Sequence, residues 1–333
     1  MRKMKWFIPV LILVLSSLIF PKKLADLPEV MKNPTIGIYG DRIFIKEHFT
    51  IHIYSLKDVK HLKQFGKEGA GPSEFKFRAE MEVFPDKLVV NTLAKQVIFS
   101  HDGKFIKEYR ITPFIINFLP VGKNFIGSNA GKEGQKINLY DENLKNPKTI
   151  YEGTLGQIVY YHSGTKGKQD MLLLRDYVYH NVYKDRIYIG DTTKGFFFMV
   201  FDSKGNKLYE VSKKYKKIKI TKEFKEMMLQ RQRESPGWKK WEKMFNYIFP
   251  EYFPAFDNIL ISDNKMYFIT QAPGNERNQV IVTDLKGKTL RECLIPSGFY
   301  EGFHTYCAYR DRLYYIVENE DEEMWELHVE DLK

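Results

Sequence analysis

The stretch DRIFI at residues 41–45 decides the fold, because a turn pair followed by a short apolar run recurs five more times along the chain. The other copies are DKLVV (86–90), GKNFI (122–126), DRIYI (185–189), NKMYF (264–268) and DRLYY (311–315). A unit of about 40 residues with four short strands is the pattern of a β-propeller blade. Six copies therefore predict six blades and an all-β, six-bladed β-propeller.

Four of the six copies are followed by a second signal, in which an apolar run enters a polar turn. The four segments are QVIFSHDGKFI (96–106), KINLYDENLKN (136–146), FFFMVFDSKGNKL (196–208) and QVIVTDLKGKTL (279–290). Three of these turns contain glycine, which tolerates the positive φ of a tight strand reversal. The pattern predicts a hairpin in the outer half of each of these blades.

The spacing between copies tests that count. Counting from residues 41, 86, 123, 185, 264 and 311, the steps are 45, 37, 62, 79 and 47 residues. Three steps match one blade, and the other two exceed it by roughly 20 and 35 residues. We assign the excess to insertions at 153–175 and 213–255. A β-sandwich is the rival interpretation, but the number of strands is too high for a small one.

One glycine-rich segment carries a family resemblance. The segment FGKEGAGPSEF (65–75) precedes an apolar run and then DKLVV (86–90). It resembles the Gly-x-x-Gly-x-Gly-Pro-Gly-Glu-Phe junction of bacterial six-bladed β-propeller proteins related to NHL repeats. The later segment FPEYFPAFDNILISDNKMYFIT (249–270) is similar to the Tyr-x-Pro-x-Phe entry into a late blade of that family. The resemblance covers residues 35–333 and implies the same fold.

The chain departs from that family in two places. Ser73 stands where the family usually has glycine, and the first 25 residues lack the lipobox cysteine that many envelope members carry. Members are described mostly by fold and not by activity. The resemblance therefore implies an architecture and says little about function.

The N-terminal segment indicates export. A basic start, MRKMK, precedes fifteen uncharged residues (6–20), as in the n- and h-regions of a secretory signal. Fifteen residues fall short of the roughly 20 that span a bilayer. Yet Ile19, Phe20 and Pro21 stand where a cleavage site needs small residues. We expect residues 1–23 to be a signal peptide or an N-terminal membrane anchor of a periplasmic or cell-envelope protein.

Charge and cysteine content set further limits. The 52 basic and 42 acidic residues give a net charge of +10, and KKYKKIK (213–219) is one concentrated basic stretch. Such a stretch can attract nucleic acid or anionic lipid, but a solvated edge strand guarded by lysines is the simpler interpretation. We therefore expect no nucleic-acid partner. Cys293 and Cys307 fall on predicted strands of different blades, where disulfide geometry is poor, so we expect two thiols.

Antiparallel strand order sorts the connections onto two faces of the ring. Turns within the inner and outer strand pairs share one face and are all short. The other face receives the glycine segment 65–75, the insertions 153–175 and 213–255, and the loop 271–278. Long irregular connections are seldom retained without use. We expect ligands to bind this loop-rich face.

The sixth blade has only three strands of its own near the end of the chain, at 303–309, 312–317 and 324–330. We expect Leu27–Met31 to supply the fourth, which makes 27–333 the propeller domain. The ring would then close between the two ends of the chain.

The glycine segment could be mistaken for a phosphate loop. It lacks the Gly-Lys-Ser/Thr ending, and no helical periodicity follows that would supply a helix N-terminus. We interpret it as a structural motif, in which glycines turn the chain over the rim and an aromatic ring fills the space between blades. Its members are Gly66, Gly69, Gly71, Pro72, Glu74 and Phe75.

Residues 221–247 form the only stretch with convincing helical periodicity. An apolar stripe including Phe224 and Met228 is interrupted at Ser235-Pro236, and Trp238 and Trp241 follow. Such stripes usually pack on their own scaffold, but Met and Trp beside basic residues also suit a lid or partner-binding element. We predict a helical insertion (213–255) between blades four and five, with both tryptophans as candidate ligand contacts.

The histidines form no recognisable metal or catalytic motif. His180 and His304 fall on predicted innermost strands and could face the central channel, and Arg277 lies in a loop-rich connection. NHL-like lyases use channel-facing histidines around zinc, but a third ligand is not evident here. No nucleophile motif appears. We therefore expect no metal, no cofactor and no catalytic residue.

Together these features favour a monomeric, non-enzymatic propeller that binds a protein, peptide or glycan on its loop-rich face. The candidate ligand-binding residues are His180, His304, Trp238, Trp241 and Arg277. The alternative is a hydrolase or lyase with its site at the channel mouth. A membrane contact through residues 6–20 is compatible with either, and a purely structural envelope role stays open.

Overall fold

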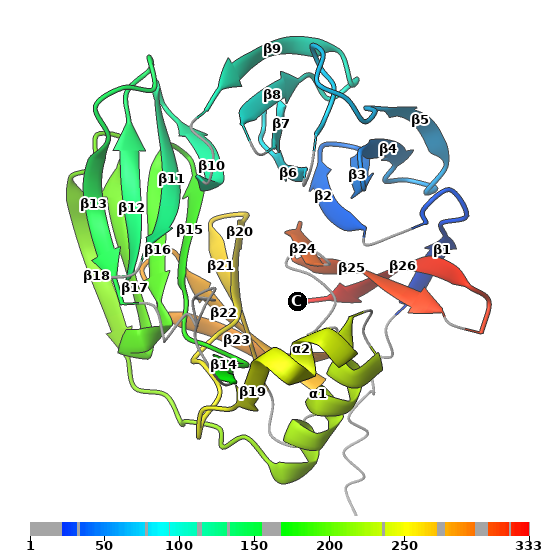
Figure 1. Cartoon of the computed structure of the whole chain (residues 1–333). Helices are drawn as coiled ribbons and strands as arrows, with labels where there is room; N and C mark the ends of the chain where they lie inside the picture. Colours follow the sequence, from blue (N-terminus) through cyan, green and yellow to red (C-terminus); the bar gives the residue numbers. More distant parts are fainter. Residues whose placement is uncertain are drawn as a thin grey trace, which may run out of the picture.

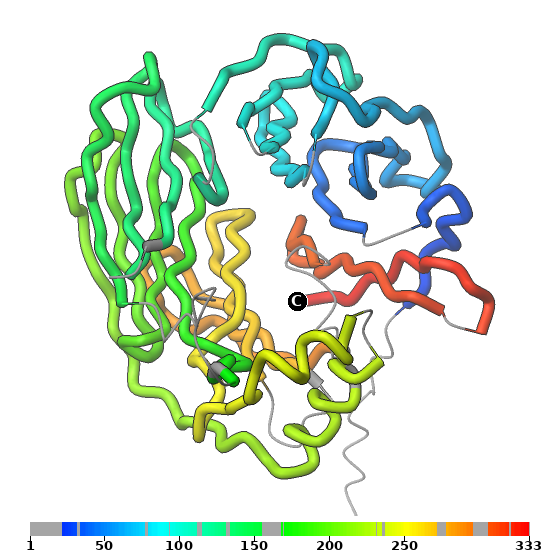
Figure 2. The backbone as a smooth tube through the Cα atoms, viewed as in Figure 1, coloured from blue at the N-terminus to red at the C-terminus, as the bar shows by residue number. Residues whose placement is uncertain are grey.

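Six four-stranded antiparallel sheets surround a central axis in the computed structural model (Figure 1). The structure describes residues 22–31, 34–76, 79–92, 94–111, 115–131, 134–154, 168–234, 237–271, 277–296, 306–319 and 321–332. In Figure 2 the chain colours run once around the ring, and the C-terminal strands lie beside the start of the chain. The predicted six-bladed β-propeller is confirmed.

Each blade runs from an innermost to an outermost strand. The first comprises β2 (Thr35–Tyr39), β3 (Arg42–Glu47), β4 (Thr50–Ser55) and β5 (His61–Phe65). The second comprises β6 (Glu80–Val83), β7 (Leu88–Asn91), β8 (Lys95–Phe99) and β9 (Phe105–Arg110). The third comprises β10 (Ile116–Val121), β11 (Asn124–Gly131), β12 (Gly134–Tyr140) and β13 (Lys148–Gly153).

The remaining blades follow the same order. The fourth comprises β15 (Val178–Tyr183), β16 (Arg186–Asp191), β17 (Phe196–Asp202) and β18 (Lys207–Lys213), with a short 3-10 helix, η1 (Thr192–Lys194), between its middle strands. The fifth comprises β20 (Asn258–Ser262), β21 (Lys265–Gln271), β22 (Arg277–Asp284) and β23 (Thr289–Pro296). The sixth comprises β24 (Tyr306–Tyr309), β25 (Arg312–Asn319), β26 (Met324–Asp331) and β1 (Lys22–Asp26).

The recurring turn pairs behave as hairpin chemistry predicts. Lys184-Asp185, Asp263-Asn264 and Arg310-Asp311 each place two successive residues at positive φ, as a type I′ turn requires. The second strand of every blade starts within one residue of its predicted position, at Arg42, Leu88, Asn124, Arg186, Lys265 and Arg312. The turn pair is therefore a reliable marker of the inner hairpin.

The hydrophobic core lies between neighbouring blades. Phe44 of the first blade packs into one cluster with Met81 and Phe99 of the second, and Phe198 of the fourth packs into another with Phe268 of the fifth. Both faces of each sheet are thus covered, which explains why the central strands are apolar along nearly their whole length and do not alternate.

The ring closes through β1, which pairs antiparallel with β26. The closing strand is Lys22–Asp26 and not the predicted Leu27–Met31, of which only Leu27 continues the pairing, through its N–H to the Trp325 carbonyl at 2.8 Å. The sequence LPEVM looked the better strand, but the backbone edge of β26 selects the residues that reach it.

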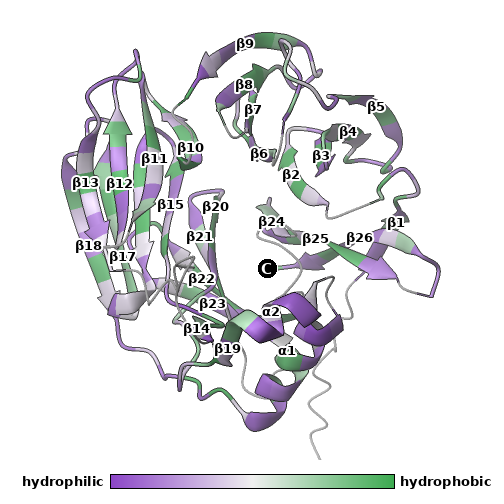
Figure 3. Ribbon diagram, viewed as in Figure 1, coloured by the Kyte–Doolittle hydropathy of each residue, from purple (hydrophilic) through white to green (hydrophobic). Residues whose placement is uncertain are grey.

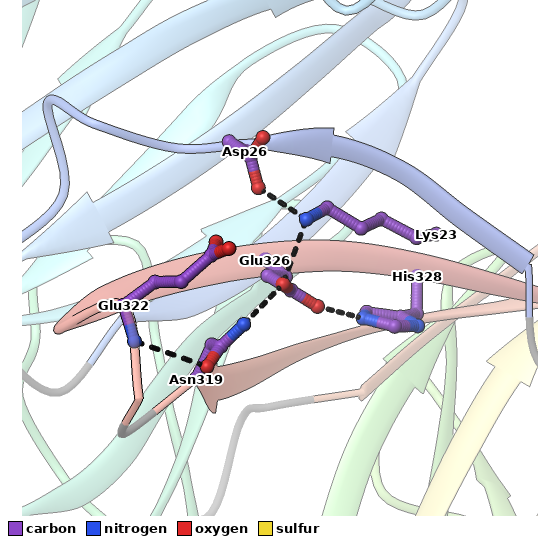
Figure 4. A network of polar contacts seen from close by, with 6 residues as sticks. All are labelled: Lys23, Asp26, Asn319, Glu322, Glu326 and His328. Carbon is purple, nitrogen blue, oxygen red and sulfur yellow. Dashed lines mark hydrogen bonds and ion pairs between the residues drawn. The ribbon is translucent and has the colours of Figure 1, made fainter.

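A polar network fixes this closure (Figure 4). The Lys23 ammonium lies 2.6 Å from Asp26 and 2.8 Å from Glu326, and the Glu326 carboxylate also accepts from Asn319 at 2.8 Å. These contacts, the Lys23 contact first, lower the pKa of Glu326 to about 2. Asp26, Glu322 and Glu326 could together face a metal ion, but the Lys23 ammonium already supplies the positive charge.

The two long insertions meet on the loop-rich face. The first contributes β14 (Gln169–Leu172), which pairs parallel with β19 (Phe245–Ile248) of the second. The second also contains α1 (Lys222–Glu234) and α2 (Trp238–Met244), in sequence between blades four and five as predicted. Figure 1 shows both helices at the lower edge of the ring, next to β14 and β19. Ser235-Pro236 lies outside the described residues.

Two further expectations concern the thiols and the membrane. Cys293 and Cys307 are both free and half-buried, as predicted. Burial raises the pKa of Cys293 to about 11. Among the described residues, no helix is both long enough and apolar enough to cross a membrane. The predicted signal or anchor segment at 6–20 lies outside them and stays a prediction.

Candidate functional site

The glycine segment is held by hydrogen bonds within itself and to the second blade. The Glu74 carboxylate accepts from the Gly71 N–H at 2.8 Å and pairs with the Lys67 ammonium at 2.8 Å, and these contacts, the Lys67 contact first, lower its pKa. The Phe75 ring is fully buried in the core between the first two blades. The Lys95 ammonium donates to the Gly71 carbonyl at 2.7 Å. These contacts support the structural role predicted for the segment.

Glycine is required in this segment for two different reasons. Gly66 has φ +89°, in the left-handed region that favours glycine. At Gly69 a Cβ atom would lie 2.0 Å from the Glu74 Oε2 atom, and at Gly71 it would lie 2.9 Å from it. Ser73, where the related family usually has glycine, adopts φ +59°, so the chain keeps the family backbone despite the substitution.

His180 lies between two blades and does not line the channel cavity. Its Nε2 atom lies 2.7 Å from the Asn117 carbonyl, and the Asn117 side chain donates to the His180 carbonyl at 2.8 Å. Burial lowers the pKa of His180 to about 4, so the ring is neutral at pH 7. This residue joins the third and fourth blades. Its neighbour Asn181 is the one that borders the channel, because adjacent strand residues point to opposite sides.

Two other candidates fall where side chains are not described. His304 lies outside the described residues, and Arg277 begins β22 opposite Pro296 with only its backbone described. Their proposed contacts with a ligand stay predictions.

The channel itself contains a cavity of about 760 Å³. All six innermost strands, β2, β6, β10, β15, β20 and β24, contribute to its wall. The cavity reaches the short-turn face, since Asp86, Lys184 and Asp263 of the inner turns border it. Glu82, Asn181 and Cys307 line it as well. The sequence gave no sign of Glu82, because a single polar residue in the strand EMEV is also what a solvated strand position looks like.

A second pair of carboxyl groups lies at the start of the innermost strands of the fourth and fifth blades. Burial, followed by the charge of Asp176, raises the pKa of Asp257 well above its usual range. Burial, followed by the charge of Asp257, also raises the pKa of the Tyr179 hydroxyl. A neutral Asp257 beside Asp176 can donate a hydrogen bond, but neither carboxyl is among the residues that line the channel cavity.

The insertion has a small core of its own. Phe224 and Met228 of α1 are buried with Ile220 and Phe253, and the rings of Phe224 and Phe253 lie 4.8 Å apart. Leu174 of the first insertion packs against this cluster. The predicted apolar stripe therefore packs against the insertions themselves.

The two tryptophans lie on the outside of this unit. Trp238 stacks on Tyr247 at 5.1 Å and Trp241 on Phe245 at 5.7 Å, so both cover β19. Trp241 nevertheless keeps 42% of its surface exposed. Together with Ile248 and Tyr252, which are 36% and 37% exposed, it forms what we call the apolar patch of the insertion.

Basic residues surround this patch. Residues 213–253 hold twelve lysines and arginines against five glutamates, a net charge of +7 out of the +10 of the whole chain. Figure 3 colours much of α1 and α2 as hydrophilic. A cavity of about 370 Å³ lies where the insertion leaves the ring, between Lys213–Lys216 and the fifth blade, with Glu292 as the acidic residue in its wall.

Comparison with known proteins adds evidence on the fold. No protein-family model and no curated protein sequence matches the chain. A solved structure of a Bacteroides fragilis protein thought to be exported is similar with a TM-score of 0.54 at 11% identity, over 94% of each chain. A Bacteroides caccae protein of unknown function gives 0.44 at 9% identity, over 80% of this chain and 82% of that one. BamB from Moraxella catarrhalis gives 0.40 at 9% identity, over 92% and 99%.

These likenesses concern fold, and the relation to NHL-repeat proteins stays a prediction from the sequence. The first of them extends over nearly the whole of both chains. The structure and this likeness together show that the chain is a six-bladed β-propeller.

Proposed function

We propose that this protein is an exported, non-enzymatic propeller that binds an acidic protein or peptide through its basic helical insertion. The observation that carries the proposal is the coincidence of three features on one unit: an apolar patch centred on Trp241, a net charge of +7, and the lysine-lined cavity beside it. Exposed aromatic residues ringed by charge are typical of the centre of a protein interface.

The charge of the insertion favours an acidic partner. Lys214 and Lys216 border the cavity and are exposed, so acidic side chains could approach them from solvent. Opposite charge accelerates encounter and suppresses wrong partners, and its effect is screened by salt. A neutral glycan would not depend on salt in this way, which separates the two kinds of ligand.

The proposal places the protein outside the cytoplasm. Its support is the basic start and uncharged stretch at residues 1–20, which has the order of a secretory signal. We expect the folded part to act as a monomer, with the ring as a scaffold and the insertion as the binding element.

Capture of partners from a detergent-solubilised envelope fraction of the source cell tests the proposal. We expect the wild-type protein to retain a protein at 50 mM salt and to release most of it at 300 mM. Trp241→Ala and the pair Lys214→Ala with Lys216→Ala should each reduce the retained amount at least about tenfold, as loss of a central contact does.

Matched variants on another blade serve as controls. Leu62 is 52% exposed on β5, and Lys57 and Lys60 are exposed in the turn before it. Leu62→Ala and the pair Lys57→Ala with Lys60→Ala should retain the partner as the wild type does. Equal retention by all variants, or retention insensitive to salt, would show that the insertion is not the binding element.

A further inference from the structure

The central channel contains a carboxyl group without a counter-charge. Glu82 lies on β6, the innermost strand of the second blade, and lines the cavity of about 760 Å³. In the described part of the chain, no ammonium or guanidinium group pairs with it, and no N–H or O–H group donates to it. Ionised groups in confined surroundings are normally paired, so this carboxyl stands out.

The channel has the size and composition of a small-molecule site. Cavities of roughly 300–1,000 Å³ with apolar walls and a few polar groups are typical of such sites. Here the walls include Ile36, Val83 and Leu119, and the polar groups beside Glu82 are few. The Asn181 amide nitrogen is already used, because it donates to the Ile259 carbonyl at 2.8 Å. Its carbonyl oxygen stays available as a second acceptor.

The electrostatic surroundings of Glu82 are acidic. Desolvation, followed by the charge of Glu80 two residues earlier, raises the pKa of Glu82 to about 7. The Cys307 thiol is near enough for Glu82 to contribute to its raised pKa. On β3, which packs beside β6, the Lys46 ammonium donates to the Ala79 carbonyl at 2.9 Å.

The mouth of the channel adds to this acidity. Asp86, Asp185 and Asp263 border it, against Lys87 and Lys184. The Lys87 ammonium lies 3.1 Å from Asp86, and the Lys184 ammonium donates to the Asn264 side chain at 2.7 Å. Both lysines are thus engaged at the turns, and the channel presents an excess of negative charge to solvent.

We propose that the channel binds a small primary amine, with the ammonium group paired to the Glu82 carboxylate and the alkyl chain against the apolar wall. The amine enters from the short-turn face, where the acidic mouth attracts cations. This site is separate from the insertion and does not rest on the protein partner proposed above.

Binding should depend on pH in a definite direction. In the free protein Glu82 is about half protonated at pH 7, and only the ionised form pairs with an ammonium. The ionised fraction rises from about one tenth at pH 6 to about nine tenths at pH 8, so the apparent affinity should rise about ninefold over this interval. The amine itself stays protonated throughout, because its pKa lies near 10.

Isothermal titration calorimetry with n-pentylamine and 1,5-diaminopentane tests the site, with 1,5-pentanediol as the uncharged probe. We expect both amines to bind the wild type more tightly at pH 8 than at pH 6, and the diol at least tenfold more weakly. Glu82→Gln keeps the shape of the side chain and removes its charge. It should weaken amine binding at least tenfold and abolish the pH dependence.

Asp86→Asn is the matched control, since it removes one carboxylate from the mouth of the same channel, where the side chain is exposed. It should change amine affinity by less than about twofold. Thermal unfolding of each variant confirms that the ring is intact. Equal amine binding by wild type and Glu82→Gln, or no amine binding by the wild type at millimolar concentrations, would overturn the proposal.

Discussion

A chain that begins at Leu27, and so lacks β1, is expected to lose on the order of 4 kcal/mol of unfolding free energy. Four residue pairs join β1 to β26, and each intramolecular hydrogen bond contributes about 1 kcal/mol. Loss of β1 also leaves the unpaired edge of β26 open to pairing with other chains. Denaturant unfolding and light scattering should therefore show a less stable protein that self-associates.

Two comparisons make this test specific to strand closure. Lys23→Ala in a chain beginning at Lys22 removes the ion pairs with Asp26 and Glu326 but keeps the backbone pairing, so its loss should be much smaller. A synthetic peptide of residues 22–31 added to the shortened chain should raise its melting temperature with concentration, because binding stabilises the folded state by mass action. A shortened chain as stable as the intact one would mean that β1 does not close the ring.

Replacing Phe75 with alanine is expected to cost about 3–5 kcal/mol, as for other buried Phe→Ala changes. The ring is fully buried between the first two blades and packs edge-on against Phe99 with centroids 5.9 Å apart. The corresponding fall in melting temperature is on the order of 10 °C. Differential scanning calorimetry measures it.

Phe105→Ala provides the control for this effect. Phe105 also contacts Phe99, at 6.3 Å, but 45% of it is exposed, so its removal leaves no closed cavity and should cost less than about 1.5 kcal/mol. If Phe75→Ala melts like the wild type, the glycine segment does not hold the two blades together, and a ligand-binding role for it regains support.

The fold was predictable because its signal is local and repeated. A polar pair such as Asp185-Arg186 before an apolar run reports a turn that the backbone confirms, with positive φ at Lys184 and Asp185. Each inner hairpin carries the same signal, so an error at one copy would not change the count. The insertions were visible for the same reason, as departures from a regular spacing.

The closing strand was predicted wrongly because its partner is distant. Pairing between Lys22 and Val329 depends on which residues reach the edge of β26, and strand propensity in KKLAD gives no hint of it. Propensity is a weak guide at an edge, where cross-strand contacts decide.

Channel residues were hard to predict because a shift of one residue along a strand changes the side on which a side chain lies. His180 was placed on the correct strand but sits between blades, and Asn181 borders the channel. Glu82 could be recognised only when six strands distant in sequence were brought around one cavity. The same holds for β14 and β19, whose pairing joins two insertions from different parts of the chain.

Removal of residues 221–250 is the measurement that tests most directly whether the ring is a scaffold and the insertion its binding element. The Ile220 N–H donates to the Glu251 carbonyl at 3.0 Å, so a short Gly/Ser turn can join these two residues without moving the strands. Every blade strand is retained. We predict a melting temperature within a few degrees of the wild type, because only the cover of Phe253 and Leu174 is lost, together with complete loss of the salt-sensitive partner. An unfolded protein, or a folded one that still captures the same partner, would contradict this account.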